Sequence, residues 1–168
     1  RKPCMPVKEH ATGSSVELVD PTHDPGDQEA MLRHGAPPLR TTVTEERARS
    51  ILSFNRSPVI PFDRSINPYR GCEHGCIYCY ARPSHAYLGM SPGLDFETKL
   101  IARPDAPAIL EKELRNPRYV PAMIAIGSNT DPYQPIEKEH QIMRGILEVL
   151  ARFNHPVAII TKGAMIER

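Results

Sequence analysis

The chain has 168 residues, 40% of them hydrophobic, and a formal net charge of +1. This composition is ordinary for a globular protein, and the small net charge gives no electrostatic reason to expect a nucleic-acid partner. No apolar run approaches the roughly 20 residues of a membrane-spanning helix, and the first ten residues, RKPCMPVKEH, lack the apolar core of a signal peptide. We therefore expect a cytoplasmic protein with no membrane partner.

The first part of the chain differs in composition from the rest. Residues 1–45 contain six prolines and no sustained apolar period, which is typical of a segment without a core of its own. We expect an irregular Pro-rich extension over 1–45 and one folded region over 46–168. At the boundary, the stretch TEERARSIL (44–52) predicts a short helix capped by Thr44.

Short strands alternate with helices from Ser65 onward. The apolar runs and their proline and glycine boundaries predict strands at 66–69, 95–103, 121–128 and 157–161, and helices at 77–88, 106–116, 135–154 and from 163 on. This alternation is typical of βαβ units, which form a parallel sheet. A closed eight-stranded barrel takes about 250 residues and the pattern here covers about four strands, so we expect the N-terminal half of an α/β barrel.

Three polar stretches follow the expected strands. They are the cysteine loop GCEHGCIYCY (71–80), SNTD (128–131) and TK (161–162). In a parallel α/β sheet the loops after the strands share one face, and ligands bind there. The sequence therefore predicts one site that combines thiols, hydroxyls, a carboxylate and a lysine.

The cysteine loop is the strongest signal for chemistry. Cys72, Cys76 and Cys79 fall within eight residues, in a chain whose sequence does not favour a disulfide framework. A closed zinc site needs four ligands, so His74 or His85 would have to supply the fourth. A cubane iron–sulfur cluster normally takes four cysteines, so three leave one iron open to another ligand. A Cys3His zinc site, an electron-transfer cluster and a catalytic cluster are all compatible with three thiols.

The spacing C-x3-C-x2-C, with Tyr78 before the last cysteine, resembles the signature of the radical S-adenosylmethionine superfamily. The wider stretch SINPYRGCEHGCIYCYARPSHAYLG, with GLDFETKL, SNTDPYQPIE and TKG further on, is similar to the spore-photolyase-like branch of that superfamily. The resemblance covers about residues 50–168. It implies a radical S-adenosylmethionine partial (β/α) barrel with parallel strands, of which this chain holds the N-terminal part.

The resemblance also implies a reaction. Cys72, Cys76 and Cys79 would ligate three irons of a 4Fe–4S cluster, and S-adenosylmethionine would chelate the fourth. One electron, from a donor such as flavodoxin or ferredoxin, would cleave S-adenosylmethionine to methionine and a 5′-deoxyadenosyl radical that abstracts a hydrogen atom from the substrate. The resemblance suggests a lyase related to DNA repair and a nucleic-acid substrate, without identifying that substrate.

Further residues acquire roles by the same resemblance. Thr130 would take the amino group of S-adenosylmethionine, with Ser128 and Asn129 nearby, and Lys162 would take the carboxylate. The alternative for SNTD is a helix-capping turn built on Asp131. At Ser128, spore photolyase itself has the cysteine that donates a hydrogen atom. An O–H is a far poorer donor, so we do not expect the same donor chemistry.

Two tyrosines and three basic residues lie around the cysteine loop. Tyr78 would lie beside the adenine, and Tyr80 matches a tyrosine that the family implicates in radical transfer; packing in the core is the alternative for both. Arg70, Arg82 and His85 would either meet a phosphate backbone or hold the loop together, and we favour the structural role.

Two functions from other classes compete with a radical enzyme. One is a zinc-stabilised Cys3His interaction module, and the other is an iron–sulfur electron-transfer protein. The first is disfavoured because the thiols come from one tight loop with no second pair of ligands. The second is disfavoured because the loop has no fourth cysteine and because two further polar loops are expected at the same face.

Overall fold

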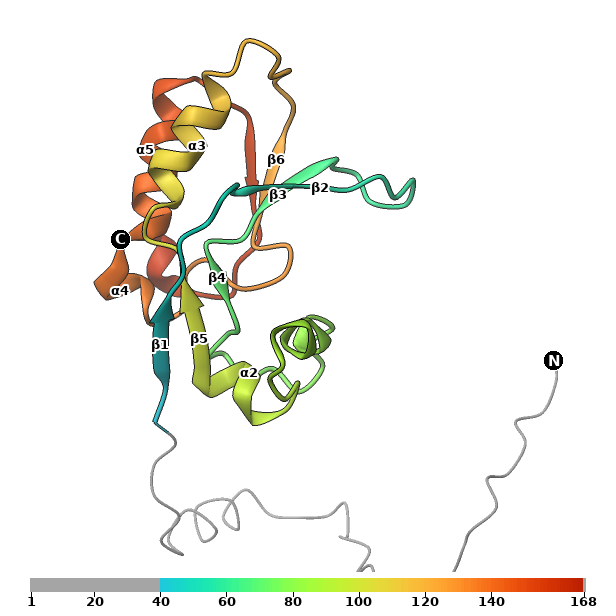
Figure 1. The fold of residues 1–168 in the computed structure, drawn as a ribbon, viewed down its shortest axis with the longest axis vertical. Helices are drawn as coiled ribbons and strands as arrows, with labels where there is room; N and C mark the ends of the chain where they lie inside the picture. Colours follow the sequence, from blue (N-terminus) through green and yellow to red (C-terminus); the bar gives the residue numbers. More distant parts are fainter. Residues whose placement is uncertain (1–39, 168) are drawn as a thin grey trace, which may run out of the picture. The chain divides into compact units, whose positions relative to one another are not determined.

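The larger of two sheets consists of β2 (Leu52–Phe54), β3 (Arg64–Ile66), β6 (Ile124–Ile126) and β7 (Val157–Ile159), in that order (Figure 1). It belongs to residues 40–167, the part of the chain that the computed structural model describes. β3, β6 and β7 are parallel, and β2 pairs antiparallel with β3 at one edge. The apolar runs that predicted buried parallel strands at 121–128 and 157–161 therefore lie in β6 and β7 as neighbours, but only β6 is buried and β7 is half-buried.

The smaller sheet consists of β1 (Thr42–Glu45), β5 (Lys99–Ala102) and β4 (Tyr69–Arg70), in that order. β1 pairs parallel with β5, and β4 pairs antiparallel with it. Only residues 67–68 separate β3 from β4. The strand predicted over 66–69 is therefore the junction of the two sheets, and the cysteine loop begins directly after it.

The helices α3 (Ala106–Leu114) and α5 (Ile142–Arg152) lie side by side and pack against the larger sheet (Figure 1). Leu110 of α3, Ile146 of α5 and Ile124 of β6 are fully buried between these layers. Five apolar side chains of α5 recur at helical spacing and are buried, because one face of the helix packs against the sheet and is removed from water. The predicted α/β class with parallel strands is confirmed.

The helix predicted over 135–154 is two helices. The first, α4 (Glu137–His140), meets α5 at Gln141, whose φ of 51° is left-handed and interrupts a right-handed helix. The carboxylate of Glu137 accepts a hydrogen bond from the backbone N–H of Met143 at 2.9 Å and from that of the next residue at 3.2 Å. Glu137 therefore caps α5 from outside it, which stabilises the break.

The helix predicted over 44–52 is wrong. Residues 42–45 form β1, and Leu52 begins β2. The side chains of β1 are all exposed, so no apolar pattern identifies it as a strand. Its ladder with β5, which continues in the hydrogen bond from Glu46 N–H to the Ala102 carbonyl (2.9 Å), outweighs the local helix propensity.

Two further predictions are correct in part. Residues 95–103, predicted as a strand, begin in the short helix α2 (Leu94–Thr98), and only their second half is β5. The helix predicted over 77–88 is a 3-10 helix, η1 (Arg82–Leu88), which starts where a proline occupies its first turn. The helix expected from 163 on is a short 3-10 segment, η2 (Ala164–Glu167).

Residues 1–39, which make up most of the predicted extension, lie outside the described residues. The last residues of the extension, 42–45, pair as β1, so the folded region begins before the expected boundary at residue 46. Within residues 40–167, no helix combines the length and the apolar content that crossing a membrane requires.

Candidate metal and cofactor site

The cysteine loop lies between β4 and η1. Cys72 is buried, Cys76 and Cys79 are half-buried, and all three thiols are free. Cys72 is tied to α2 by the hydrogen bond from its N–H to the Phe96 carbonyl (2.8 Å). Burial raises the pKa of the Cys72 thiol. The loop therefore holds one enclosed and two more accessible sulfur atoms.

Two of the basic residues near the loop contact backbone carbonyl groups, one in the loop itself and the other in β5. Arg82 donates to the carbonyl oxygen of Cys76 from Nε (3.2 Å) and Nη2 (3.1 Å). His85 is fully buried, with Nε2 2.9 Å from a backbone carbonyl of β5. Arg70 pairs instead with Glu46, at 3.5 Å. The contacts of Arg82 and His85 support the structural role that we favoured over phosphate binding.

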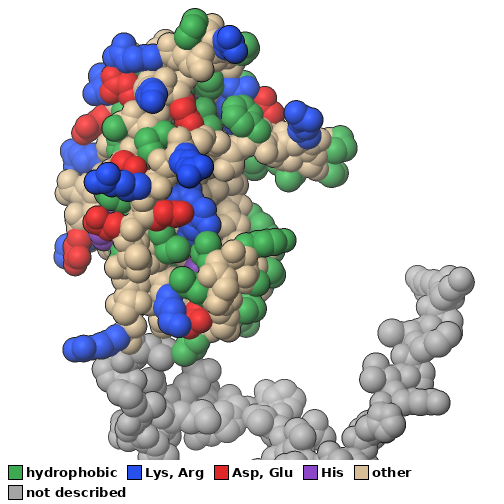
Figure 2. Space-filling view, in the orientation of Figure 1, with side chains coloured by type: hydrophobic (Ala, Val, Ile, Leu, Met, Phe, Trp, Pro, Cys, Tyr) green, Lys and Arg blue, Asp and Glu red, His purple; other side chains and the backbone are tan. Residues whose placement is uncertain are grey.

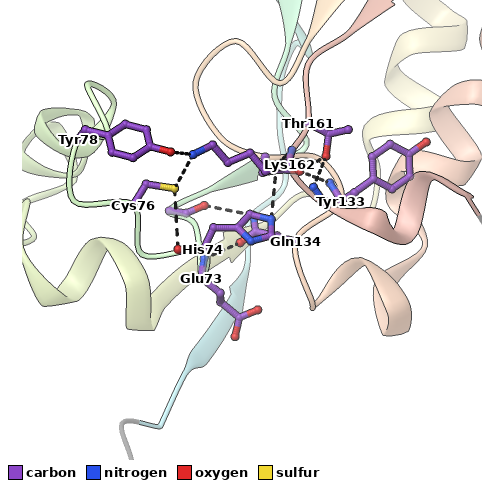
Figure 3. A network of polar contacts seen from close by, with 11 residues as sticks. Glu73, His74, Cys76, Tyr78, Tyr133, Gln134, Thr161 and Lys162 are labelled. Carbon is purple, nitrogen blue, oxygen red and sulfur yellow. Dashed lines mark hydrogen bonds and ion pairs between the residues drawn. The ribbon is translucent and has the colours of Figure 1, made fainter. Parts of the chain in front are cut away.

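Lys162 connects the loop after β7 to the cysteine loop (Figure 3). Its amine lies 3.3 Å from Sγ of Cys76, hydrogen bonds to the hydroxyl of Tyr78 and lies 4.2 Å from the centre of the Tyr78 ring. The hydrogen bonds to Tyr78 and Cys76 raise the pKa of Lys162, so the amine is an ammonium at neutral pH. Two of the three predicted polar stretches therefore meet.

The loop after β6 is joined to the same site through its backbone. The side chain of Asn67 accepts from the N–H groups of Asn129 (2.9 Å) and Thr130 (3.3 Å) and donates to the hydroxyl of Ser128 (3.3 Å). The buried Thr130 hydroxyl donates to the Tyr69 carbonyl (2.8 Å). The sequence analysis did not identify Asn67, although it is a polar residue at the end of a buried strand.

Tyr78 and Tyr80 lie at the surface of the site, where 75% and 79% of them are exposed. The interpretation of either as a core aromatic is therefore wrong. The hydroxyl of Tyr80 donates to the Ser128 carbonyl, which links the cysteine loop to the loop after β6. Ile77 and Tyr87 are also exposed, and Figure 2 shows hydrophobic side chains gathered on the surface near η1.

Two histidines, His74 and His85, lie near the thiols of the cysteine loop. Nε2 of His74 faces Oδ2 of Asp131 at 3.4 Å, and Nε2 of His85 lies 2.9 Å from a backbone carbonyl of β5, so one ring nitrogen of each imidazole faces a partner other than a thiol. Within residues 40–167 no three Cys, His, Asp or Glu side chains are already gathered to hold a metal ion. A closed zinc site takes four protein ligands, whereas an iron–sulfur cluster held by three thiols keeps one iron open.

Comparison with curated proteins finds relatives described only as uncharacterized. Proteins of Mycobacterium tuberculosis and Mycobacterium bovis are 42% identical over 119 residues, 69% of this chain. A protein of Methanocaldococcus jannaschii is 26% identical over 103 residues, 61% of this chain. The chain spans only 35% and 36% of the length of these relatives. No family model and no solved structure matches the chain.

Proposed function

We propose that this protein is a radical S-adenosylmethionine enzyme of the spore-photolyase-like group, with its cofactor site at the three loops described above. The observation that supports this most directly is the 3.3 Å approach of the Lys162 amine to Cys76. It brings a cation to the loop where a carboxylate ligand of an open iron would need one. Neither a zinc module nor an electron-transfer domain requires a protonated lysine beside its thiols.

We propose the matching architecture for the fold. The parallel order of β3, β6 and β7 and the packing of α3 and α5 on their sheet agree with the first part of a partial (β/α) barrel. In such a barrel the loops after the parallel strands face the ligand. The contact between the loops after β6 and β7 and the cysteine loop is what this arrangement requires.

The three cysteines would hold the cluster. Cys72, Cys76 and Cys79 would each ligate one iron of a 4Fe–4S cluster as thiolates, which leaves one iron for S-adenosylmethionine. When bound and reduced, this cluster supplies the electron that cleaves S-adenosylmethionine to methionine and a 5′-deoxyadenosyl radical. Burial raises the pKa of the Cys72 thiol, so this thiol would have to lose its proton to ligate iron.

The neighbouring side chains would hold S-adenosylmethionine. Lys162, whose pKa is raised by its hydrogen bonds to Tyr78 and Cys76, would exchange those two partners for the carboxylate of the methionine. Tyr78, with its ring largely exposed, is free to pack against the adenine. The Thr130 hydroxyl donates a hydrogen bond to the Tyr69 carbonyl, so its oxygen still has lone pairs that can accept a hydrogen bond from the amino group.

Three further assignments complete the proposal. Ser128 and Asn129 would line the amino-group side, and Tyr80, whose hydroxyl bridges to Ser128, would take part in radical transfer. A flavodoxin or ferredoxin would supply the electron, and the substrate would be a nucleic acid. Fluorescence anisotropy with single- and double-stranded DNA at two salt concentrations tests the substrate class, because phosphate contacts weaken as salt rises.

Anaerobic reconstitution of the protein with iron and sulfide tests the central claim. After reduction with dithionite and addition of S-adenosylmethionine, we expect a brown protein that forms 5′-deoxyadenosine, measured by mass spectrometry. Cys76→Ala should abolish the product. Cys4→Ala removes a thiol that lies outside the motif and should keep it.

The same experiment separates the competing functions. A colourless protein that binds zinc through the loop would contradict the proposal and favour the interaction module. A brown protein that never cleaves S-adenosylmethionine would favour electron transfer. Exchanging dithionite for reduced flavodoxin then tests the proposed electron donor.

A further inference from the structure

We propose that Asp131 and Gln134 are positioning residues, and that residues 131–134 hold the cysteine loop and the end of β7 in fixed register before any ligand binds. The SNTD stretch would then contribute to the site mainly through the bonds that this segment makes to the two other loops. The geometric claim is independent of the cofactor. Only the statement that the held ligand is S-adenosylmethionine rests on the proposed function.

Asp131 holds the loop after β7. Its largely buried carboxylate accepts hydrogen bonds at Oδ1 from Tyr133 N–H (2.8 Å) and the Thr161 hydroxyl (2.7 Å), and at Oδ2 from Lys162 N–H (2.6 Å). Oδ2 also faces Nε2 of His74 in the cysteine loop at 3.4 Å. Only one of these contacts is local, so the interpretation of Asp131 as a helix cap misses its main role.

Gln134 holds the cysteine loop. It is fully buried, its Oε1 accepts from Glu73 N–H (3.1 Å) and its Nε2 donates to the Gly71 carbonyl (3.2 Å). These two backbone groups stand on either side of Cys72. A side chain with one donor and one acceptor at its tip is needed to satisfy both, and glutamine has this pair.

The backbone of residues 131–134 also packs directly on the loop after β7. A Cβ atom on Gly163 would lie 2.4 Å from the carbonyl oxygen of Tyr133, so only glycine permits this approach. The position of the Lys162 backbone is therefore set by Asp131 on one side and by this contact on the other. From there the Lys162 side chain reaches Cys76 (Figure 3).

Two isosteric variants test the geometric claim in the metal-free protein. In Asp131→Asn, either orientation of the amide places its NH2 group against an N–H or O–H group that donates a hydrogen bond to the carboxylate in the wild type. In Gln134→Glu, an oxygen faces the Gly71 carbonyl. By hydrogen exchange and mass spectrometry, we expect peptides over 71–80 to exchange at least about tenfold faster in Gln134→Glu, because Gln134 holds the backbone of the cysteine loop. Asp131→Asn should accelerate exchange over 160–163, because Asp131 accepts from Thr161 and Lys162.

A conservative pair keeps the test valid if Asp131→Asn does not fold. Thr161→Val removes one donor to Asp131 and also the acceptor of the Gly163 N–H (2.9 Å), so the exchange is read at the Lys162 N–H, which donates to Asp131 itself. That N–H should exchange faster in Thr161→Val, whereas Thr161→Ser retains the hydroxyl and should behave like the wild type. Glu139→Gln, at an exposed residue of α4, is the surface control. Wild-type exchange over 71–80 in Gln134→Glu, or equal exchange in the two Thr161 variants, would overturn the proposal.

The functional part is tested on reconstituted protein. We expect Asp131→Asn to weaken binding of S-adenosylmethionine at least about tenfold, or 1.4 kcal/mol, with unchanged iron content and cluster absorbance, because the lysine moves and the thiols remain. An unchanged Kd would refute a positioning role for Asp131. If the wild type fails to cleave S-adenosylmethionine while the exchange results hold, the proposed function is wrong and the geometric claim stands.

Discussion

Replacing Tyr69 by phenylalanine tests how the core supports the site. Tyr69 is fully buried in β4, and its hydroxyl donates to the buried carboxylate of Glu137, which also accepts from Met143 N–H. Burial, with a further contribution from the hydrogen bond to Glu137, raises the pKa of Tyr69, so the phenol remains a donor throughout the accessible pH range. The change removes one hydrogen bond to a buried charge and leaves the ring in place.

The expected loss follows from that geometry. A hydrogen bond to a charged group contributes about 1.5–3 kcal/mol, and Phe fills nearly the same volume as Tyr, so little cavity cost is added. We therefore expect the free energy of unfolding to fall by about 2 kcal/mol. With a urea m-value of about 1.5 kcal/mol/M, the midpoint should fall by about 1–2 M.

The assay is urea unfolding followed by circular dichroism. Tyr119→Phe is the matched control, because its hydroxyl also makes a hydrogen bond, to Nε2 of the half-buried His155 at 2.7 Å, and this partner is an imidazole and not a carboxylate. We expect that variant to lose only about 1 kcal/mol. If Tyr69→Phe costs no more than Tyr119→Phe, the charged, buried character of the Glu137 interaction does not contribute as we argue.

Two more predictions concern single sites. Gly127→Ala should cost about 2–4 kcal/mol in urea unfolding, because φ is +85° and a Cβ would lie 2.1 Å from the Ile160 carbonyl oxygen; Gly89→Ala, with φ +71° and open space, should cost less. Arg115 holds the pKa of Glu111 below its usual value, so the ionised carboxylate stabilises the fold above about pH 4.3 and stops doing so as pH falls through the folded-state pKa. Between about pH 7 and about pH 3, the melting temperature should therefore fall less in Glu111→Gln than in the wild type. An equal fall in the two proteins would contradict this prediction.

The parts of the fold that sequence predicts best are those whose own side chains are buried. β6 has three consecutive buried residues, and α5 carries an apolar stripe, so each is marked locally by its hydrophobic pattern. β1 is fully exposed and exists through its ladder to β5. The break at Gln141 depends on a cap that comes from Glu137, and no local period indicates such a cap.

The candidate site likewise contains some residues that local sequence patterns indicate and others that they do not. The spacing of the cysteines and the position of Lys162 after an apolar strand are local signals, and the structure brings Cys76 and Lys162 together. Asn67 and Gln134 act on backbone groups 61 to 63 residues away. A polar residue gives no sequence pattern that names such a distant partner, so their roles could not be predicted.

The chemistry of the cysteine loop explains why a distant amide is needed there. Burying Cys72 takes the carbonyl of Gly71 and the N–H of Glu73 away from water, and buried backbone groups must be paired. A loop that leaves its thiols available for metal cannot pair these groups within itself as a helix would. Gln134 supplies both partners, and a leucine of similar size would leave both unpaired. The cysteine motif therefore specifies the thiols, whereas Gln134, which follows the next parallel strand, β6, allows the loop that carries them to be buried.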